Sequence, residues 1–387
     1  MIARAQRHRV TRRRAGLLVV VALLVMTVSN ASPVASVGSA DTKVLTIGEV
    51  GGMSPQVEAV ITSAAERFGA RWAIFHRGTV RLVSVERGDD IVQAAPSGYF
   101  YPMSTAAVDA RRSAPLLGAE ATAVLESGGL VFGATSARLR GASVGDRVNL
   151  VGWDGRTYQF AVGAVVADEV IGWAELALDA EAAAGIGFDR PAFVAIWDHG
   201  PEDELLLAMW SQLPDALLAI DTHFDPEDPD AVLPTVLVKE QFGEFAYRPA
   251  SGDRIILEAE WRRANIVDVN LPHLGPFRCH KEIVPLLEGA LEEIEAEGLA
   301  WMIDYWDFQI SGGCYNPRLI RGGDKGGAVS RHTWGIAIDI NPSDNPYGGR
   351  VGMDERIGEI FRSWGFAWGA GWRFTDGGHF EWTHEVE

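Results

Sequence analysis

The stretch SRHTWGIAIDIN, residues 330–341, places a histidine and an aspartate seven positions apart on either side of a glycine. In one straight strand, His332 and Asp339 would lie about 23 Å apart and on opposite faces, because a strand rises about 3.3 Å per residue with a period of two. Gly335 lies between them, and glycine tolerates backbone bends that other residues resist. We therefore expect a bend at Gly335 that brings the two side chains together.

The second half of this stretch alternates between two kinds of residue. Ile336, Ile338 and Ile340 would share one face of a strand, and Asp339 would lie on the other face. A strand with this alternation packs its apolar face against a core. Burying the aspartate is costly unless a partner or a metal ion compensates its charge. Asp339 is therefore predicted to meet such a partner.

A second alternating segment, TDGGHFEWTHE, follows at residues 375–385. Its apolar residues Phe380 and Trp382 would face the core, and His379 and Glu381 would face the opposite side. The pattern predicts a second short strand that presents a histidine and a carboxylate on the same side.

Two histidines and one carboxylate, with a fourth position left for water, form the ligand set of a catalytic zinc site. We predict that His332, Asp339 and His379 bind Zn²⁺ in this way. The ion would polarise a scissile carbonyl and acidify water. Hydrolysis also needs a proton carrier, and Asp376, three residues before His379, is the predicted general base. Glu381 is expected to orient His379 or a neighbouring residue.

Each of these residues also has an ordinary structural interpretation. Taken alone, His332 or His379 could be a hydrogen-bonded histidine of the core, and a histidine and an aspartate at this spacing occur together by chance. The tryptophans between residues 334 and 372 are expected to form core and the wall of a groove. The zinc hypothesis therefore depends on the whole ligand set arriving within one domain.

The C-terminal half resembles the zinc D-alanyl-D-alanine carboxypeptidases of the VanY type and the related L-alanyl-D-glutamate endopeptidases of phage lysins. The closing motif of that family, acid-x-x-H-F-E-W, is met by residues 376–382, with aspartate where many members carry glutamate. Its S-x-H-x-x-G-x-A-x-D motif is met by Ser330, His332, Gly335, Ala337 and Asp339. The likeness covers residues 238–387 and implies that the two histidines and Asp339 bind zinc and that Asp376 is the base.

The resemblance also implies an arginine, upstream of the first histidine, that holds a carboxylate or carbonyl of the substrate. The segment GGCYNPRLIRGG, residues 312–323, offers Arg318 and Arg321, of which Arg318 fits the pattern better. A peptide with a free carboxylate needs a cation, and a bidentate guanidinium also fixes its orientation. The alternative is a surface arginine paired with Asp324 or Asp344.

The chain has only two cysteines, Cys279 and Cys314. We expect them to form a disulfide, because the sequence indicates export to a compartment where disulfides persist. In the chain-entropy account, closing this loop stabilises the fold by roughly 3 to 4 kcal/mol. The alternative is that the thiols are zinc ligands.

We expect an α+β protein in successive parts. Residues 41–197 are predicted to form a β-rich α+β domain of unknown role, and residues 198–237 an acidic, proline-rich linker. Residues 238–387 are predicted to form the zinc-peptidase domain, with a small antiparallel sheet and flanking helices.

Local signals place several elements. Capping residues and apolar spacing predict helices over residues 54–69, 281–303 and 354–366. In residues 148–166, the dipeptide Asp154-Gly155 lies between two alternating runs and predicts a β-hairpin.

The first 40 residues have the layout of an export signal. They carry six arginines and no acidic residue, and an apolar run over residues 15–28 is followed by small residues. An uncleaved membrane anchor is the alternative. Removing these arginines leaves 28 basic residues against 52 acidic ones, a net charge of −24. Such a surface repels nucleic acid, so we expect no nucleic-acid partner.

We therefore predict an exported zinc metallopeptidase, secreted or held in the cell envelope outside the cytoplasmic membrane. Its substrates would be D-amino-acid-containing bonds of peptidoglycan stem peptides, and we expect it to be a monomer. One alternative is a catalytically silent module that binds peptidoglycan. Another alternative is an adaptor for an envelope transporter, in which residues 41–197 are the active part. If the protein is a peptidase, the same residues could bind an envelope partner.

Overall fold

The computed structural model describes residues 44–49, 52–152, 154–187, 190–213, 216, 218–220, 228–304, 307, 313–320, 327–372 and 374–384. The chain divides into two compact units, Met1–Ser36 and Val37–Glu387, and every described residue belongs to the second. The predicted export signal lies outside the described residues. Among the described helices, none combines the length and the apolar character needed to cross a bilayer. The predicted α+β class is confirmed, with a large mixed sheet and several small antiparallel sheets.

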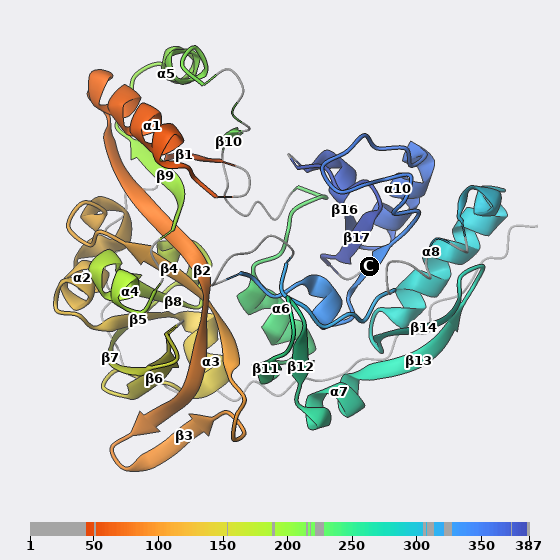
Figure 1. The fold of residues 1–387 in the computed structure, drawn as a ribbon, viewed down its shortest axis with the longest axis horizontal. Helices are drawn as coiled ribbons and strands as arrows, with labels where there is room; N and C mark the ends of the chain where they lie inside the picture. Colours follow the sequence, from red (N-terminus) through yellow and green to blue (C-terminus); the bar gives the residue numbers. More distant parts are fainter. Residues whose placement is uncertain are drawn as a thin grey trace, which may run out of the picture. The chain divides into compact units, whose positions relative to one another are not determined.

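Within the described residues, ten strands form the large sheet, in the order β10-β1-β9-β2-β4-β8-β5-β7-β6 with β3 paired to β2 (Figure 1). Two pairings, β4 with β8 and β5 with β7, are parallel, and the others are antiparallel. The strands are β1 (Leu45–Glu49), β2 (Arg71–Arg87), β3 (Asp90–Ala94), β4 (Tyr101–Val108), β5 (Leu130–Gly133), β6 (Arg147–Val151), β7 (Thr157–Val166), β8 (Leu176–Asp179), β9 (Pro191–Trp197) and β10 (Leu218–Ile220).

Short helices cover this sheet. In β5, Phe132 packs in one apolar cluster with Ala137 of α3, while its neighbour Val131 packs in another with Leu125 of α2. Alternate residues of a strand point to opposite faces, so the two helices lie on opposite sides of the sheet. The helices of this part are α1 (Pro55–Arg67), α2 (Ala114–Glu126), α3 (Ala134–Arg140), η1 (Asp168–Ile171), α4 (Ala180–Gly185) and α5 (Glu202–Trp210).

Two local predictions for this part are confirmed. The helix expected over residues 54–69 is α1, whose N-terminus is capped by Ser54 through a hydrogen bond from the Val57 N–H, 3.4 Å long. The hairpin expected at Asp154-Gly155 joins β6 to β7, and Gly155 takes a φ of +80°. The stretch predicted as a linker, residues 198–237, contains α5 and also β10, which pairs with β1.

The C-terminal part contains three small antiparallel sheets, formed by β11 with β12, by β13 with β14, and by three strands in the order β15-β17-β16. Its strands are β11 (Tyr247–Pro249), β12 (Ile255–Leu257), β13 (Ile266–Leu271), β14 (Gly275–His280), β15 (Ala337–Asp339), β16 (Phe366–Trp368) and β17 (His379–Trp382). Its helices are α6 (Thr235–Phe242), α7 (Ala259–Asn265), α8 (Val284–Ala296), η2 (Ala300–Met302), η3 (Arg331–Thr333), α10 (Glu355–Ser363) and η4 (Gly369–Gly371).

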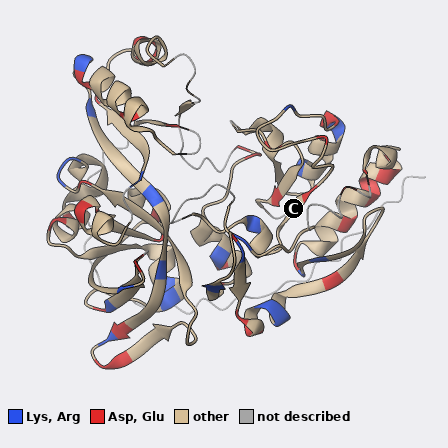
Figure 2. Ribbon diagram, in the orientation of Figure 1, with Lys and Arg blue, Asp and Glu red and all other residues tan. Residues whose placement is uncertain are grey.

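The helices expected over residues 281–303 and 354–366 are present as α8 and α10. Helix α8 is shorter than predicted because Gly298, with a φ of +71°, turns the chain out of the helix. Figure 2 shows acidic residues along α8, and they lie on its solvent side: Glu292 is exposed, whereas the neighbouring Leu291 is fully buried.

One apolar core joins these helices to the three-stranded sheet. Ile336, Ile338 and Ile340 are all fully buried in it, which confirms the predicted alternation. Phe380 stacks on Phe361 of α10 with ring centroids 4.1 Å apart. The predicted disulfide between Cys279 and Cys314 is also confirmed, and it ties β14 to the chain before η3.

A buried ionic cluster connects the large sheet to α6. The Lys239 ammonium lies 2.8 Å from a Glu175 oxygen and 2.8 Å from a Glu244 oxygen. The Arg140 guanidinium lies 2.7 Å from Glu175 and also pairs with Glu244. Two cations and two carboxylates balance one another, so losing any one would leave an uncompensated charge in the interior.

Candidate metal centre

The bend expected at Gly335 is present, and it redirects the chain from η3 into β15. Ser330 begins η3, where its hydroxyl accepts a hydrogen bond from the His332 N–H, 3.4 Å long. Gly335 has a φ of +73°, and a Cβ atom there would lie 2.9 Å from the backbone nitrogen of His280. A side chain would therefore suffer both backbone strain and a steric clash, so the turn requires glycine.

The strands β15 and β17 bring the second half of the site together. Their antiparallel register sets Asp339 opposite His379 and Ala337 opposite Glu381. Opposed residues point to the same face of a sheet. Ala337 has a small side chain, which leaves room on that face for Glu381, Asp339 and His379.

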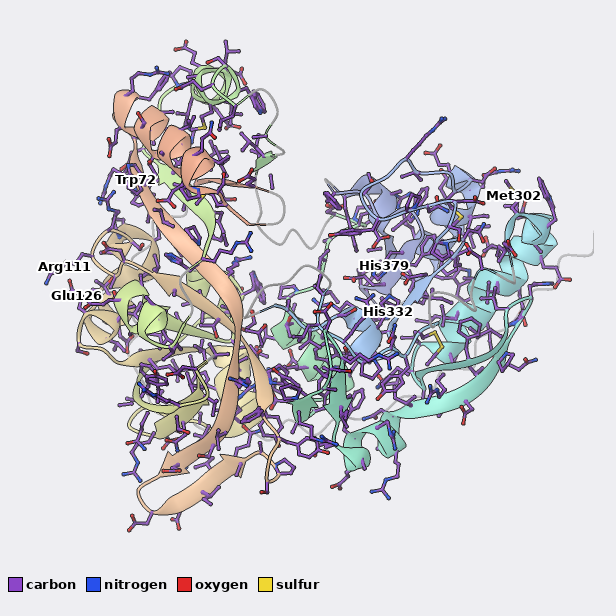
Figure 3. The ribbon with its side chains drawn as sticks, viewed as in Figure 1. Trp72, Arg111, Glu126, Met302, His332 and His379 are labelled. Atoms are coloured by element: carbon purple, nitrogen blue, oxygen red, sulfur yellow. A yellow bond between two sulfur atoms is a disulfide. The ribbon has the colours of Figure 1, made fainter. Side chains whose placement is uncertain are left out.

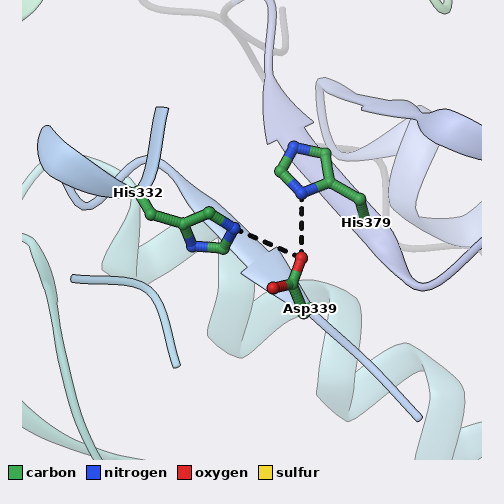
Figure 4. Close-up of side chains that lie close together, drawn as sticks. All are labelled: His332, Asp339 and His379. Carbon is green, nitrogen blue, oxygen red and sulfur yellow. Dashed lines mark hydrogen bonds and ion pairs between the residues drawn. The ribbon is translucent and has the colours of Figure 1, made fainter. Parts of the chain in front are cut away.

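The three predicted ligands lie close together (Figure 4). The Asp339 Oδ1 atom is 3.2 Å from Nε2 of His332 and 2.9 Å from Nδ1 of His379. One ligand atom from each residue lies within 4.8 Å of the other two. Both imidazoles are buried, and the Asp339 side chain is 18% exposed. Figure 3 labels the two histidines, which come from η3 and β17.

The surroundings of His332 fix which of its nitrogens carries a proton. Its Nδ1 atom lies 3.1 Å from the carbonyl oxygen of Gly313 and 3.2 Å from that of Cys314. Carbonyl oxygens only accept hydrogen bonds, so Nδ1 must be the N–H donor. In the neutral ring, Nε2 then presents a lone pair toward Asp339.

His379 also faces Asp339 with one ring nitrogen, but that nitrogen is Nδ1, whereas in His332 it is Nε2. Its Nε2 atom lies 3.1 Å from Oε2 of Glu381, so of the two expected targets of Glu381, His379 or a neighbour, it contacts His379. A carboxylate accepts, so the ring can donate to Glu381 through Nε2 or to Asp339 through Nδ1; in the neutral tautomer that donates to Glu381, the Nδ1 lone pair faces Asp339.

In these neutral tautomers, two imidazole lone pairs face one carboxylate oxygen, an arrangement that repels unless a cation lies among the three atoms. Either a proton or a metal ion can take that role. Burial lowers the pKa of His379, but the hydrogen bonds to Asp339 and Glu381 raise it to about 10. Burial raises the pKa of Asp339, yet the charge of His332 and the hydrogen bonds from both rings hold it well below its usual range. One nitrogen from each histidine and one oxygen of Asp339 form a donor set that fits a metal ion such as zinc.

Asp376 lies beside this cluster in the turn before β17. Its N–H donates to the Gly369 carbonyl over 2.8 Å, and its own carbonyl accepts the His379 N–H over 2.9 Å. Burial raises the pKa of its carboxyl group, and the negative charge of Asp339 raises it further. A carboxyl with a raised pKa suits a group that accepts and returns a proton.

Arg318 is held next to η3 through its backbone. Its N–H donates to the Thr333 hydroxyl over 3.1 Å, and that hydroxyl donates back to the Arg318 carbonyl over 3.0 Å. Its charge lowers the pKa of Asp376, so the guanidinium acts on the same site. Arg321, the other candidate, and Asp324 lie outside the described residues.

Two further residues lie at the site, and neither was predicted to contact a ligand or its partner. Arg331 is buried, and its Nε atom lies 3.7 Å from Oε1 of Glu381. Trp372, expected only as core or groove wall, packs on His379 with ring centroids 5.4 Å apart. Arg331 stands at a variable position of the family motif, where an arginine looks like any surface residue.

Comparison with known proteins was made on the whole chain. Residues 323–382 match the family model described as D-alanyl-D-alanine carboxypeptidase. The match contains the three clustered ligands and Asp376, and it begins five residues after Arg318. No curated protein matches the chain. Through residues 323–382, the C-terminal region is thus similar to the D-alanyl-D-alanine carboxypeptidase family that its two motifs predicted.

Proposed function

We propose that this protein is a zinc-dependent peptidase that hydrolyses D-amino-acid-containing bonds in peptidoglycan stem peptides. The observation that carries the proposal is the convergence of Nε2 of His332 and Nδ1 of His379 on the Asp339 carboxylate. It occurs inside the region that matches a peptidase family. Zinc favours this mixture of nitrogen and oxygen donors, and three protein ligands leave room for water or substrate.

The residues around the site divide the work of hydrolysis. Bound zinc would supply a Lewis acid that polarises the scissile carbonyl and acidifies water. Asp376 takes the proton of the attacking water and passes it to the leaving amine, a role that its burial-raised pKa favours. Arg318 holds a carboxylate or carbonyl of the peptide, because a guanidinium can bind it through two hydrogen bonds.

We extend the proposal to the setting of the enzyme. The arginine-rich and apolar features of residues 1–40 support export, and the negative net charge supports a partner other than nucleic acid. The large sheet of the N-terminal part serves to place the peptidase or to bind an envelope partner, and the protein acts as a monomer.

The test uses the purified full chain and muropeptides from digested cell wall. With one equivalent of zinc, we expect mass spectrometry to show loss of D-alanine or cleavage within the stem, and a chelator should abolish the reaction. Muropeptides that stay intact at full zinc occupancy would refute the proposal. Binding without cleavage would instead favour a silent peptidoglycan-binding module.

A further inference from the structure

Arg331, the residue before the first zinc histidine, is anchored by a segment far away in sequence. One of its terminal nitrogens donates to the Leu233 carbonyl, and the other lies 3.3 Å from the Thr235 hydroxyl. Its side chain is only 10% exposed. A guanidinium so buried has a fixed orientation, because its rigid fork of donors is held at several points.

Arg331 in turn compensates the carboxylate that orients His379. The two oxygens of Glu381 have different partners: Oε2 faces the His379 ring at 3.1 Å, and Oε1 faces Arg331 at 3.7 Å. Within the part of the chain that the structure describes, Oε1 makes no hydrogen bond. The ion pair with Arg331 therefore adds to the His379 contact in compensating the charge of this buried group.

Asp230, in the same segment, holds a second residue that contacts His379. Its carboxylate pairs with Arg362, with an Nε to Oδ1 distance of 2.8 Å, and accepts the Trp368 N–H over 2.9 Å. Its backbone carbonyl accepts the Trp372 indole N–H over 2.8 Å. Trp372 is the ring that packs on His379, so Asp230 fixes the surface against which this ligand rests.

We propose that residues 230–235 are a positioning segment of the metal centre. Asp230 holds Trp372 against His379, and Leu233 and Thr235 hold Arg331, which keeps Glu381 in place beside the same ring. The segment lies outside residues 323–382, which match the peptidase family, and before residue 238. The inference rests on the metal site of the proposed function, and it adds that the site is incomplete without this segment.

The expected size of the effect follows from similar outer partners of metal-binding histidines. Removing a group that orients such a ring costs about 10- to 100-fold in metal affinity. The pair formed by Arg331 and Glu381 should lie at the upper end, because its loss leaves a buried carboxylate unbalanced. Loss of the Asp230 charge should cost less, since its backbone carbonyl still holds Trp372.

The experiment measures zinc binding by the full chain, by competition with a chromophoric chelator, and the visible spectrum of the Co²⁺-loaded protein. The variants are Arg331→Met, which keeps length without charge, Arg331→Lys, which restores the charge, and Asp230→Asn. Matched controls are Arg356→Met and Asp268→Asn at exposed positions. We expect zinc affinity to fall about 10- to 100-fold in Arg331→Met and to recover in part in Arg331→Lys. The Co²⁺ spectrum should change, and both controls should match the parent protein.

The outcomes separate this inference from the proposed function. If the parent protein binds no zinc, the proposed function fails and the inference fails with it. If the parent binds zinc and Arg331→Met and Asp230→Asn bind it equally well with unaltered Co²⁺ spectra, only the inference is refuted. If circular dichroism shows that Arg331→Met does not fold, zinc binding by Thr235→Val tests the inference instead. This change removes one contact of Arg331 and keeps the volume of the side chain nearly the same. Weaker zinc binding by folded Thr235→Val supports the proposal, and unchanged binding overturns it.

Discussion

Asp339 and His379 stand directly opposite each other on the antiparallel strands β15 and β17. Side chains at such positions lie about 5 Å apart on one face, which is close enough to share a ligand. The neighbouring pair, Ile338 and Phe380, is fully buried in the core. A slip of one residue would turn His379 into the core, so the packing of the apolar pair fixes the geometry of the metal site.

Replacing the proposed base tests the chemistry without disturbing the ligands. Asp376→Asn keeps the shape of the side chain but cannot accept a proton. We expect kcat/KM toward muropeptides to fall at least about 100-fold, since general-base groups contribute about 10² to 10⁴. Zinc content, measured by mass spectrometry of the metal, should stay the same.

The matched control for this change is Asp268→Asn on the exposed side of β13. It should retain the parent rate. An Asp376→Asn protein that cleaves as fast as the parent would remove Asp376 from the mechanism, whereas a loss of zinc would show that the residue supports the ligands instead.

The turn at Gly335 should be intolerant of any side chain. Gly335→Ala meets both the cost of a left-handed backbone, about 1 to 2 kcal/mol, and a clash with the backbone of His280. Gly298→Ala is the matched control, because its φ of +71° is similar and nothing lies within 4 Å of the added Cβ. Urea unfolding should show a larger loss of stability for Gly335→Ala, together with weaker zinc binding.

Equal losses of stability in the two alanine variants would contradict this reading. They would mean that the strand and η3 adjust to relieve the contact with His280, and that only the backbone conformation demands glycine at residue 335.

Local periodicity was enough to predict much of the site. The alternation of Ile336, Ile338 and Ile340 identified a strand with one apolar face, and the glycine between His332 and Asp339 identified the bend. These features depend on the order of neighbouring residues, so they can be read from the sequence. The convergence of β15 with β17 followed only from the ligand chemistry of their polar faces.

The contacts made by the stretch predicted as a linker could not be read in the same way. Its acids and prolines resemble those of an exposed connection, yet Asp230 pairs with Arg362 and β10 joins the large sheet. These partners lie more than a hundred residues away, and no periodicity relates them. Long-range charge pairing leaves no local signal, and for the same reason the role of Arg331 was missed.

His280 should give the stability of the protein a distinct dependence on pH. Burial lowers its pKa to about 4, against 6.5 for the exposed residue, and the charge of Lys281 adds to this effect. Between these values the unfolded chain takes up a proton that the folded chain refuses, so the free energy of unfolding falls as the pH drops from 6.5 to about 4. The full effect is about 3 kcal/mol at 1.36 kcal/mol per pKa unit.

The variant His280→Asn isolates this contribution. Its amide oxygen can accept the Glu282 N–H, as the Nδ1 atom of His280 does over 3.3 Å, but it does not titrate. The difference in unfolding free energy between parent and variant should shrink as the pH falls below 6.5. A difference that is constant from pH 7 to pH 4 would show that His280 keeps an ordinary pKa in the folded protein.

The buried cluster that joins α6 to the large sheet should depend on charge balance more than on any single contact. Lys239→Met leaves Glu175 and Glu244 with Arg140 as their only buried cation in the described cluster, so we expect a loss of about 3 to 5 kcal/mol in unfolding free energy. Lys239→Met combined with Glu175→Gln restores neutrality and should lose less than the sum of the single changes. Lys281→Met, at an exposed lysine, is the control, and its unfolding free energy should stay near the parent value.

Strictly additive losses would contradict this prediction. They would mean that the four groups act as separate hydrogen bonds and that no shared charge network binds the N-terminal sheet to α6.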